Sequence, residues 1–156
     1  MLFALGSSDV DSSKYDTDKV YNVGDTLDCP SYDITVDNVQ IKGKGTSIGG
    51  YQTISDSEWI AVTLTIKNKS SEQQTYNDAS VTLTNSNGEI LNHATWVYDI
   101  WGVKMLDSPE LESGGTKTGY IQYKNNNDDN SKLVLNVDCD TDLLDDNITY
   151  KVNISQ

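Results

Sequence analysis

The sequence has no arginine, and only two cysteines, two prolines, one phenylalanine and one histidine. Without arginine the chain lacks the planar guanidinium fork that binds phosphate groups bidentately. All of its basic residues are lysines, 11 against 24 Asp and Glu, so the formal net charge is −13. Such a chain repels polyanions, which makes nucleic acid and bare anionic lipid poor partners. We expect the acidity to keep the protein soluble and monomeric.

The sequence also lacks the run of roughly 20 apolar residues that a membrane-spanning helix needs. Membrane association is therefore expected only through an anchor outside this chain. A length of 156 residues predicts one domain, long enough to bury a core of its own. Residues 7–22 are rich in Ser, Asp, Lys and Tyr and show no periodicity. We predict a flexible lead-in or linker over 1–22 and a folded domain over 23–156.

Short alternating strands separated by turns dominate the rest of the chain. Branched apolar residues occupy every second position of the segment Ile60-Ala61-Val62-Thr63-Leu64-Thr65-Ile66, which predicts a strand with one buried face. Similar patterns recur at 33–41, 133–139 and 148–154. The sequence therefore predicts an all-β, immunoglobulin-like antiparallel sandwich of about seven or eight strands.

Two local irregularities add detail to this prediction. Ile34 and Val36 lie on one face of their strand, whereas Val39 and Ile41 have the opposite parity, so we predict a β-bulge near Asp37 and Asn38. Asn87-Gly88 stands between two apolar runs and predicts a tight hairpin turn.

The two cysteines are Cys29, near an early strand, and Cys139, at the end of a late strand. Alternation predicts that both thiols point inward. Because first and last strands often lie side by side in sandwiches, a disulfide is geometrically plausible. Two buried free thiols are the alternative. The absence of a CxxC spacing argues against a metal site.

An aromatic segment at 93–101 holds the only histidine and two of the three tryptophans. Exposed aromatic rings at this density can form a platform for sugar rings or for a protein partner. The alternative is that the rings cover an open edge or end of the sandwich. If the domain has a binding surface, we predict that it consists of Trp96, Tyr98 and Trp101.

No catalytic or cofactor motif interrupts the strands. The sequence contains no G-x-S-x-G nucleophile elbow for which His93 could act as the base, and no pair of carboxylates stands out. We therefore expect that the protein is not an enzyme and has no cofactor. The acidic turn from Asp138 to Asp146 has Leu143 and Thr149 where an EF-hand loop needs Gly and Glu. We predict no metal site, although calcium binding by this turn in another geometry stays open.

Several landmarks occur together in a recognisable order: Val23-Gly24-Asp25, the strand 59–66 closing on Lys67-Asn68-Lys69-Ser70, Asn87-Gly88-Glu89, Gly114-Gly115 and Gly119-Tyr120-Ile121-Gln122-Tyr123. This pattern resembles an immunoglobulin-like domain family of unknown function, found in exported lipoproteins and membrane-anchored proteins of Gram-positive bacteria. It is more distantly similar to small secreted immunoprotective antigens of mycobacteria. The resemblance implies an extracytoplasmic sandwich without known enzymatic activity. Many members carry a lipobox cysteine near the start, whereas here none precedes Cys29, so lipid anchoring of this chain is not expected.

These observations favour an extracellular or cell-surface domain without catalytic activity. The leading hypothesis is a binding or interaction module for a protein or cell-envelope component. A structural spacer within a cell-envelope protein is the alternative. Exposure of Trp96, Tyr98 and Trp101 would favour the binding module, and their burial would favour the spacer.

Overall fold

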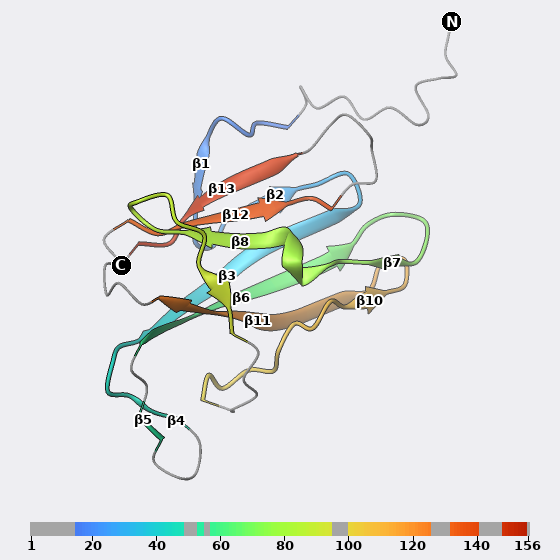
Figure 1. Cartoon of the computed structure of the whole chain (residues 1–156). Coiled ribbons are helices and arrows are strands. Elements are labelled where there is room, and N and C mark those ends of the chain that lie inside the picture. The colour runs from blue at the N-terminus through green and yellow to red at the C-terminus, as the bar shows by residue number, and fades with distance from the viewer. Residues whose placement is uncertain are drawn as a thin grey trace, which may run out of the picture.

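The structure is a computed structural model that describes residues 15–48, 53–54, 57–94, 100–125, 132–140 and 148–155. Figure 1 shows two stacked β-sheets, and the all-β sandwich predicted from the sequence is confirmed. The first sheet has four strands in the order β1 (Val20–Asn22), β13 (Thr149–Asn153), β12 (Val134–Asp138) and β8 (Val81–Thr84). The second sheet has five, in the order β2 (Thr26–Asp28), β3 (Tyr32–Lys42), β6 (Glu58–Asn68), β11 (Thr116–Asn125) and β9 (Asn92–His93).

Smaller elements connect the strands of these sheets. Two short ribbons pair β7 (Gln74–Thr75) with β10 (Glu110–Leu111) and β4 (Ser47–Ile48) with β5 (Thr53–Ile54). A single 3₁₀ turn, η3 (Asp78–Ser80), precedes β8. The β4–β5 ribbon projects away from the sandwich in Figure 1.

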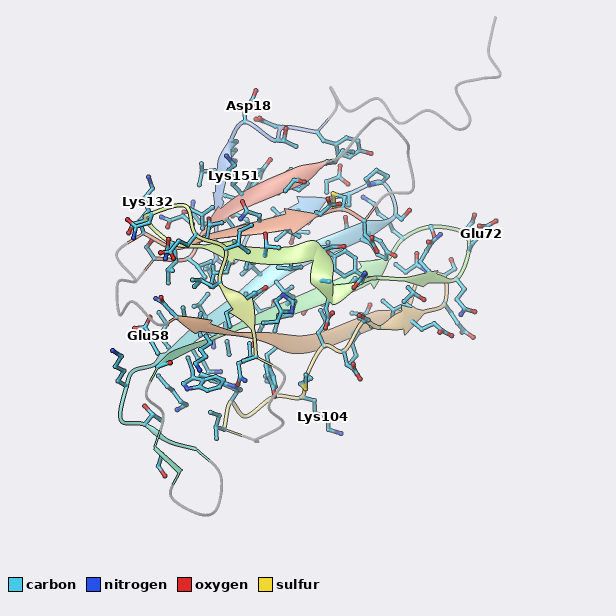
Figure 2. All side chains as sticks on the ribbon, viewed as in Figure 1. Asp18, Glu58, Glu72, Lys104, Lys132 and Lys151 are labelled. Atoms are coloured by element: carbon cyan, nitrogen blue, oxygen red, sulfur yellow. A yellow bond between two sulfur atoms is a disulfide. The ribbon has the colours of Figure 1, made fainter. Side chains whose placement is uncertain are left out.

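The core lies between the two sheets and follows the predicted alternation. Inward residues of β6 have no exposed surface, and they share one apolar cluster with the inward residues of β12 and β13: Ile60, Val62, Leu64, Ile66, Leu135, Val137, Tyr150 and Val152. Except for Glu58, the charged side chains labelled in Figure 2 are exposed on the outside of this sandwich. The period-2 pattern therefore identified the buried face correctly.

Both predicted irregularities are present. The pairing of β3 with β6 shifts register between Val36 and Asn38, which confirms the β-bulge. Gly88 has a φ of +78°, and the Leu91 N–H donates to the Leu83 carbonyl at 2.8 Å across the turn. The Asn85 side chain accepts hydrogen bonds from the backbone N–H groups of Asn87 and Glu89, each at 3.0 Å, and so stabilises the turn.

The N-terminal boundary differs from the prediction. Val20–Asn22, which we assigned to the lead-in, forms β1 and pairs in parallel with β13, so ordered structure begins before residue 23. Three residues are too few to show an alternation, and their partner strand lies at the far end of the sequence. Residues 1–14 of the predicted lead-in lie outside the described residues.

Candidate functional site

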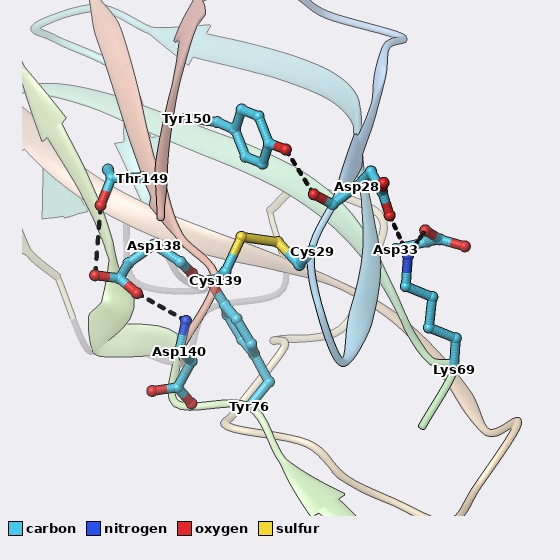
Figure 3. Close-up of a disulfide and its surroundings, with 10 residues drawn as sticks. All are labelled: Asp28, Cys29, Asp33, Lys69, Tyr76, Asp138, Cys139, Asp140, Thr149 and Tyr150. Atoms are coloured by element: carbon cyan, nitrogen blue, oxygen red, sulfur yellow. Dashed lines mark hydrogen bonds and ion pairs between the residues drawn. A yellow bond between two sulfur atoms is a disulfide. The ribbon is translucent and has the colours of Figure 1, made fainter. Parts of the chain in front are cut away.

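A disulfide joins the two sheets at one end of the sandwich (Figure 3). Cys29 follows β2 of the second sheet, Cys139 follows β12 of the first, and their Cα atoms lie 5.4 Å apart. Both residues are fully buried in the main core. Of the two arrangements that the sequence left open, the structure has the covalent one. The bond connects positions 110 residues apart in the sequence.

Two buried tyrosines brace the chain next to the disulfide. The Tyr150 hydroxyl donates to the carbonyl of Asp28, and the Tyr76 hydroxyl donates to the carbonyl of Asp138, each at 2.6 Å. Each acceptor is the residue immediately before a cysteine. Burial raises the pKa of Tyr150 to about 12 and raises the pKa of Tyr76 well above its usual value. Both side chains therefore remain neutral hydrogen-bond donors at physiological pH.

Charged groups surround this end of the molecule. Lys69 bridges Asp28 and Asp33, and its Nζ lies 3.1 Å from the Asp33 carboxylate (Figure 3). Although burial lowers the pKa of Lys69, the hydrogen bonds to these two carboxylates and the attraction of their charges together raise it by more. These ion pairs lie near the surface, so each contributes little to the free energy of folding.

The acidic turn that begins at Asp138 is described only as far as Asp140. The Asp138 carboxylate accepts from the Asp140 N–H at 2.7 Å, and the Asp140 carboxylate accepts from the Asn77 N–H at 3.0 Å. Residues 141–147, which include the rest of the predicted acidic turn, lie outside the described residues. Within the described ranges, no three His, Cys, Asp or Glu side chains are grouped so that they could hold a metal ion.

The predicted aromatic surface is corrected at Trp101. This residue is 4% exposed and packs with Trp59, Ala61 and Tyr120 in a second apolar cluster. These residues point outward from the second sheet, so the chain around residue 101 covers that sheet on its outer face. The indole N–H donates to the Gln122 side-chain oxygen at 2.5 Å. Trp101 is thus a covering residue, as in the alternative interpretation, but it covers the outer face of the second sheet and not an edge or end of the sandwich.

The other two members of that predicted surface, Trp96 and Tyr98, lie outside the described residues. His93, the only histidine of the sequence, lies in β9 of the second sheet. Its Nε2 lies 3.1 Å from the Val81 carbonyl, and its ring packs edge-on against Tyr123.

Residues 100–106, which we call the covering segment, are held against β11 by close backbone contacts. The Leu106 N–H donates to the Tyr120 carbonyl at 2.9 Å, and the Tyr120 N–H donates to the Lys104 carbonyl at 3.0 Å. A Cβ atom at Gly119 would lie 2.6 Å from the Cα of Leu106. Only glycine allows this approach, so Gly119, one of the landmarks of the family resemblance, has a structural role.

A row of four threonines crosses the exposed part of the second sheet. The strand register places one threonine of β2, β3, β6 and β11 directly opposite the next: Thr26, Thr35, Thr65 and Thr118. Hydroxyl contacts of 2.9 Å between the first two and 2.8 Å between the last two connect them in pairs. The Thr65 hydroxyl also donates to Asp37, the bulge residue, at 2.5 Å. Sequence reasoning missed this row, because each threonine alone is an ordinary outward-facing strand residue.

In the described part of the chain, no helix is long and apolar enough to cross a membrane.

Solved structures with the same fold come from several Gram-positive bacteria. The yjhA protein of Bacillus subtilis has 22% identity and a TM-score of 0.67, with 86% of this chain and 99% of that chain covered. An uncharacterized β-sandwich protein of Clostridium difficile has 16% identity and a TM-score of 0.51, with 87% and 95% covered. The ycdA protein of Bacillus subtilis, described as a "putative lipoprotein", has 13% identity and a TM-score of 0.58, with 82% and 38% covered.

No curated protein matches this chain. The pattern of one protein family does match, over residues 21–151, which include every strand of the sandwich from β2 to β12 and most of β1 and β13. The chain therefore belongs to the family described as domain of unknown function DUF4352.

Proposed function

We propose that this chain is a non-catalytic spacer domain of an exported cell-envelope protein. The observation that carries the proposal is the Cys29–Cys139 disulfide, which locks the two sheets together at one end. Disulfides persist in oxidising compartments and are rare in the reducing cytosol. The fold shared with the ycdA protein, described as a "putative lipoprotein", supports the same location.

Coverage of the molecule's surfaces favours a spacer over a binding module. Trp101, one of the predicted platform residues, is buried against the second sheet. The outer strand β1 is capped, because the Asn22 N–H donates to the Asp25 carboxylate at 2.8 Å and the Asp25 N–H donates back to Asn22 at 3.0 Å. At the opposite edge of that sheet, Leu91 pairs with Leu83 of β8. These contacts leave fewer backbone groups at the two edges of the first sheet for the addition of a foreign strand.

Strand direction supports the same role. Because β1 and β13 run in parallel, the chain enters the first sheet at one end and leaves it at the other. This geometry suits a domain placed in series between other parts of a protein.

A binding module is the second candidate, and the threonine row favours it. Thr26 and Thr118 are exposed, and the row offers hydroxyl groups at regular strand spacing on one sheet face. Such a face could exchange its internal hydroxyl contacts for contacts with a hydroxyl-rich partner such as a cell-wall glycan.

One experiment separates the two candidates. Fluorescently labelled full chain is mixed with purified Gram-positive cell-wall fragments and sedimented, beside a Thr35→Lys/Thr118→Lys variant whose fold is checked by circular dichroism. The spacer predicts no saturable binding by either protein. Saturable binding that the variant loses would overturn the spacer in favour of the threonine face.

The compartment is tested separately. Protein isolated from its native cells under thiol-trapping conditions should contain no alkylated cysteine before reduction and two after it. Alkylation of Cys29 and Cys139 without reduction would contradict an exported domain.

A further inference from the structure

The named strands of the described chain form one parallel pair, and that pair contains both ends of the sandwich. β1 and β13 align Val20 with Lys151, Tyr21 with Val152 and Asn22 with Asn153. Tension on the chain before β1 and after β13 would pull these two strands in opposite directions along their own axes. The inter-strand hydrogen bonds would then be loaded together in shear instead of one after another.

We propose that this domain bears mechanical tension along its chain, with β1–β13 as a shear clamp and the Cys29–Cys139 disulfide as a covalent limit to extension. The inference rests on the proposed spacer function and adds that the spacer bears tension. The shear clamp is defined as β1, β13 and the side chains that connect them.

Side-chain contacts strengthen the clamp beyond its few backbone pairs. The Tyr21 ring lies edge-on to the Tyr150 ring with centroids 5.2 Å apart, so one aromatic contact spans the two strands. The Tyr21 hydroxyl donates to the Asp16 carbonyl at 2.9 Å, and the Lys19 ammonium lies 4.8 Å from the centre of the Tyr21 ring. These two contacts connect the Tyr21 side chain of β1 to the residues just before the strand, where tension would arrive.

The clamp is also tied to the second sheet. Directly after β1, the Gly24 N–H donates to the Val36 carbonyl of β3 at 2.7 Å. On β13, the Tyr150 hydroxyl donates to the Asp28 carbonyl beside Cys29. Sliding of β1 along β13 would therefore break contacts to the second sheet as well.

The disulfide determines where tension goes after the clamp yields. Cys29 lies shortly after β1 in the sequence, and Cys139 shortly before β13. Force would pass from residue 29 through the sulfur–sulfur bond to residue 139. The intervening chain, which contains β3, β6, β8 and β11, lies outside this covalent path. Two of the four strands of the first sheet, β8 and β12, and every strand of the second sheet except β2 are thus shielded from unravelling.

The test is single-molecule force spectroscopy on the full chain with one handle at each end. Under oxidising conditions, we expect an extension shorter by about 380 Å than under reducing conditions, because the disulfide withholds 110 residues at ~3.5 Å each. The measurement that decides the proposal is the rupture force of the first event. We expect Tyr21→Ala to lower that force by more than the error of the measurement, because it removes the ring contact across the clamp.

Leu64→Ala is the matched control, because Leu64 is fully buried in β6 inside the disulfide loop. It should lower the thermal midpoint more than Tyr21→Ala does, yet leave the rupture force of the oxidised protein within error of the parent. Asp25→Ala, which removes the hydrogen bond that supports the end of β1 at Asn22, is a milder variant in case Tyr21→Ala fails to fold. It should lower the rupture force without changing the thermal midpoint by more than a few degrees.

A rupture force that follows thermal stability across the three variants would overturn the clamp. So would a parent domain that extends gradually without a distinct first event. Either result would leave the spacer standing, since a spacer need not bear load, whereas saturable wall binding would remove the spacer without altering the force measurement.

Discussion

Gly119 lies directly against the backbone of Leu106, so close that a Cβ atom at residue 119 would lie 2.6 Å from the Leu106 Cα and from its nitrogen. This contact joins β11 to the segment that covers the outer face of the second sheet. The covering segment brings Trp101 over Ala61, and so β6 is buried on both faces at that end.

We therefore expect Gly119→Ala to displace the covering segment and to lower the free energy of unfolding by about 1–3 kcal/mol, the usual range for overpacking. Urea denaturation measures this loss. Gly43→Ala is the matched control, because a Cβ there meets nothing within 4 Å. Equal stability of the two variants would contradict the close contact.

Trp101 gives a spectroscopic prediction. Its buried indole donates to Gln122, so its emission should be blue-shifted and protected from iodide quenching. Trp101→Phe should remove a protected component from the emission of the folded protein and cost about 1 kcal/mol or more, since it leaves Gln122 without its donor. If the component lost in this variant is instead red-shifted and quenched by iodide, Trp101 is exposed and its burial is contradicted.

The disulfide gives a stability prediction. Loss of the 110-residue loop in Cys29→Ser/Cys139→Ser should lower the free energy of unfolding by at most about 4–5 kcal/mol in the chain-entropy model. Urea titrations of the parent with and without dithiothreitol should reproduce this difference. The double variant is its own control, because reductant should not change its midpoint.

Tyr150 gives a pH prediction. Burial raises its pKa from 10.0 in the unfolded chain to about 12 in the folded protein, so the folded state retains the proton longer. The contribution of this group is complete below pH 10 and is lost as the pH rises through 12. We expect the thermal midpoint to fall over that window, and to fall less steeply in Tyr150→Phe.

The slope should not vanish in Tyr150→Phe, because burial also raises the pKa of Tyr76 and of Tyr123. Identical pH profiles for Tyr150→Phe and the parent would mean that burial does not raise the pKa of Tyr150. Below pH 10, the variant should lose about 0.5–1.5 kcal/mol, the usual net contribution of one hydrogen bond.

Local pattern was enough to predict the strands and their irregularities. The alternation from Ile60 to Ile66 gives the buried face of β6, the parity change after Val36 gives the bulge, and Asn87-Gly88 gives the turn. Each of these depends on neighbours in the sequence, because side-chain period and turn conformation are properties of a few consecutive residues.

Only the tertiary structure decided which distant residues meet. The pairing of β1 with β13, the burial of Trp101 over Ala61, the threonine row and the choice of a disulfide over free thiols all depend on strand order and register. Sequence determined that this chain is a β-sandwich with two inward cysteines. Contacts between segments as far apart as residues 20 and 151 determined which faces are covered and which strands would bear tension. These contacts depend on register, which is set by the packing of the whole domain and not by any one strand.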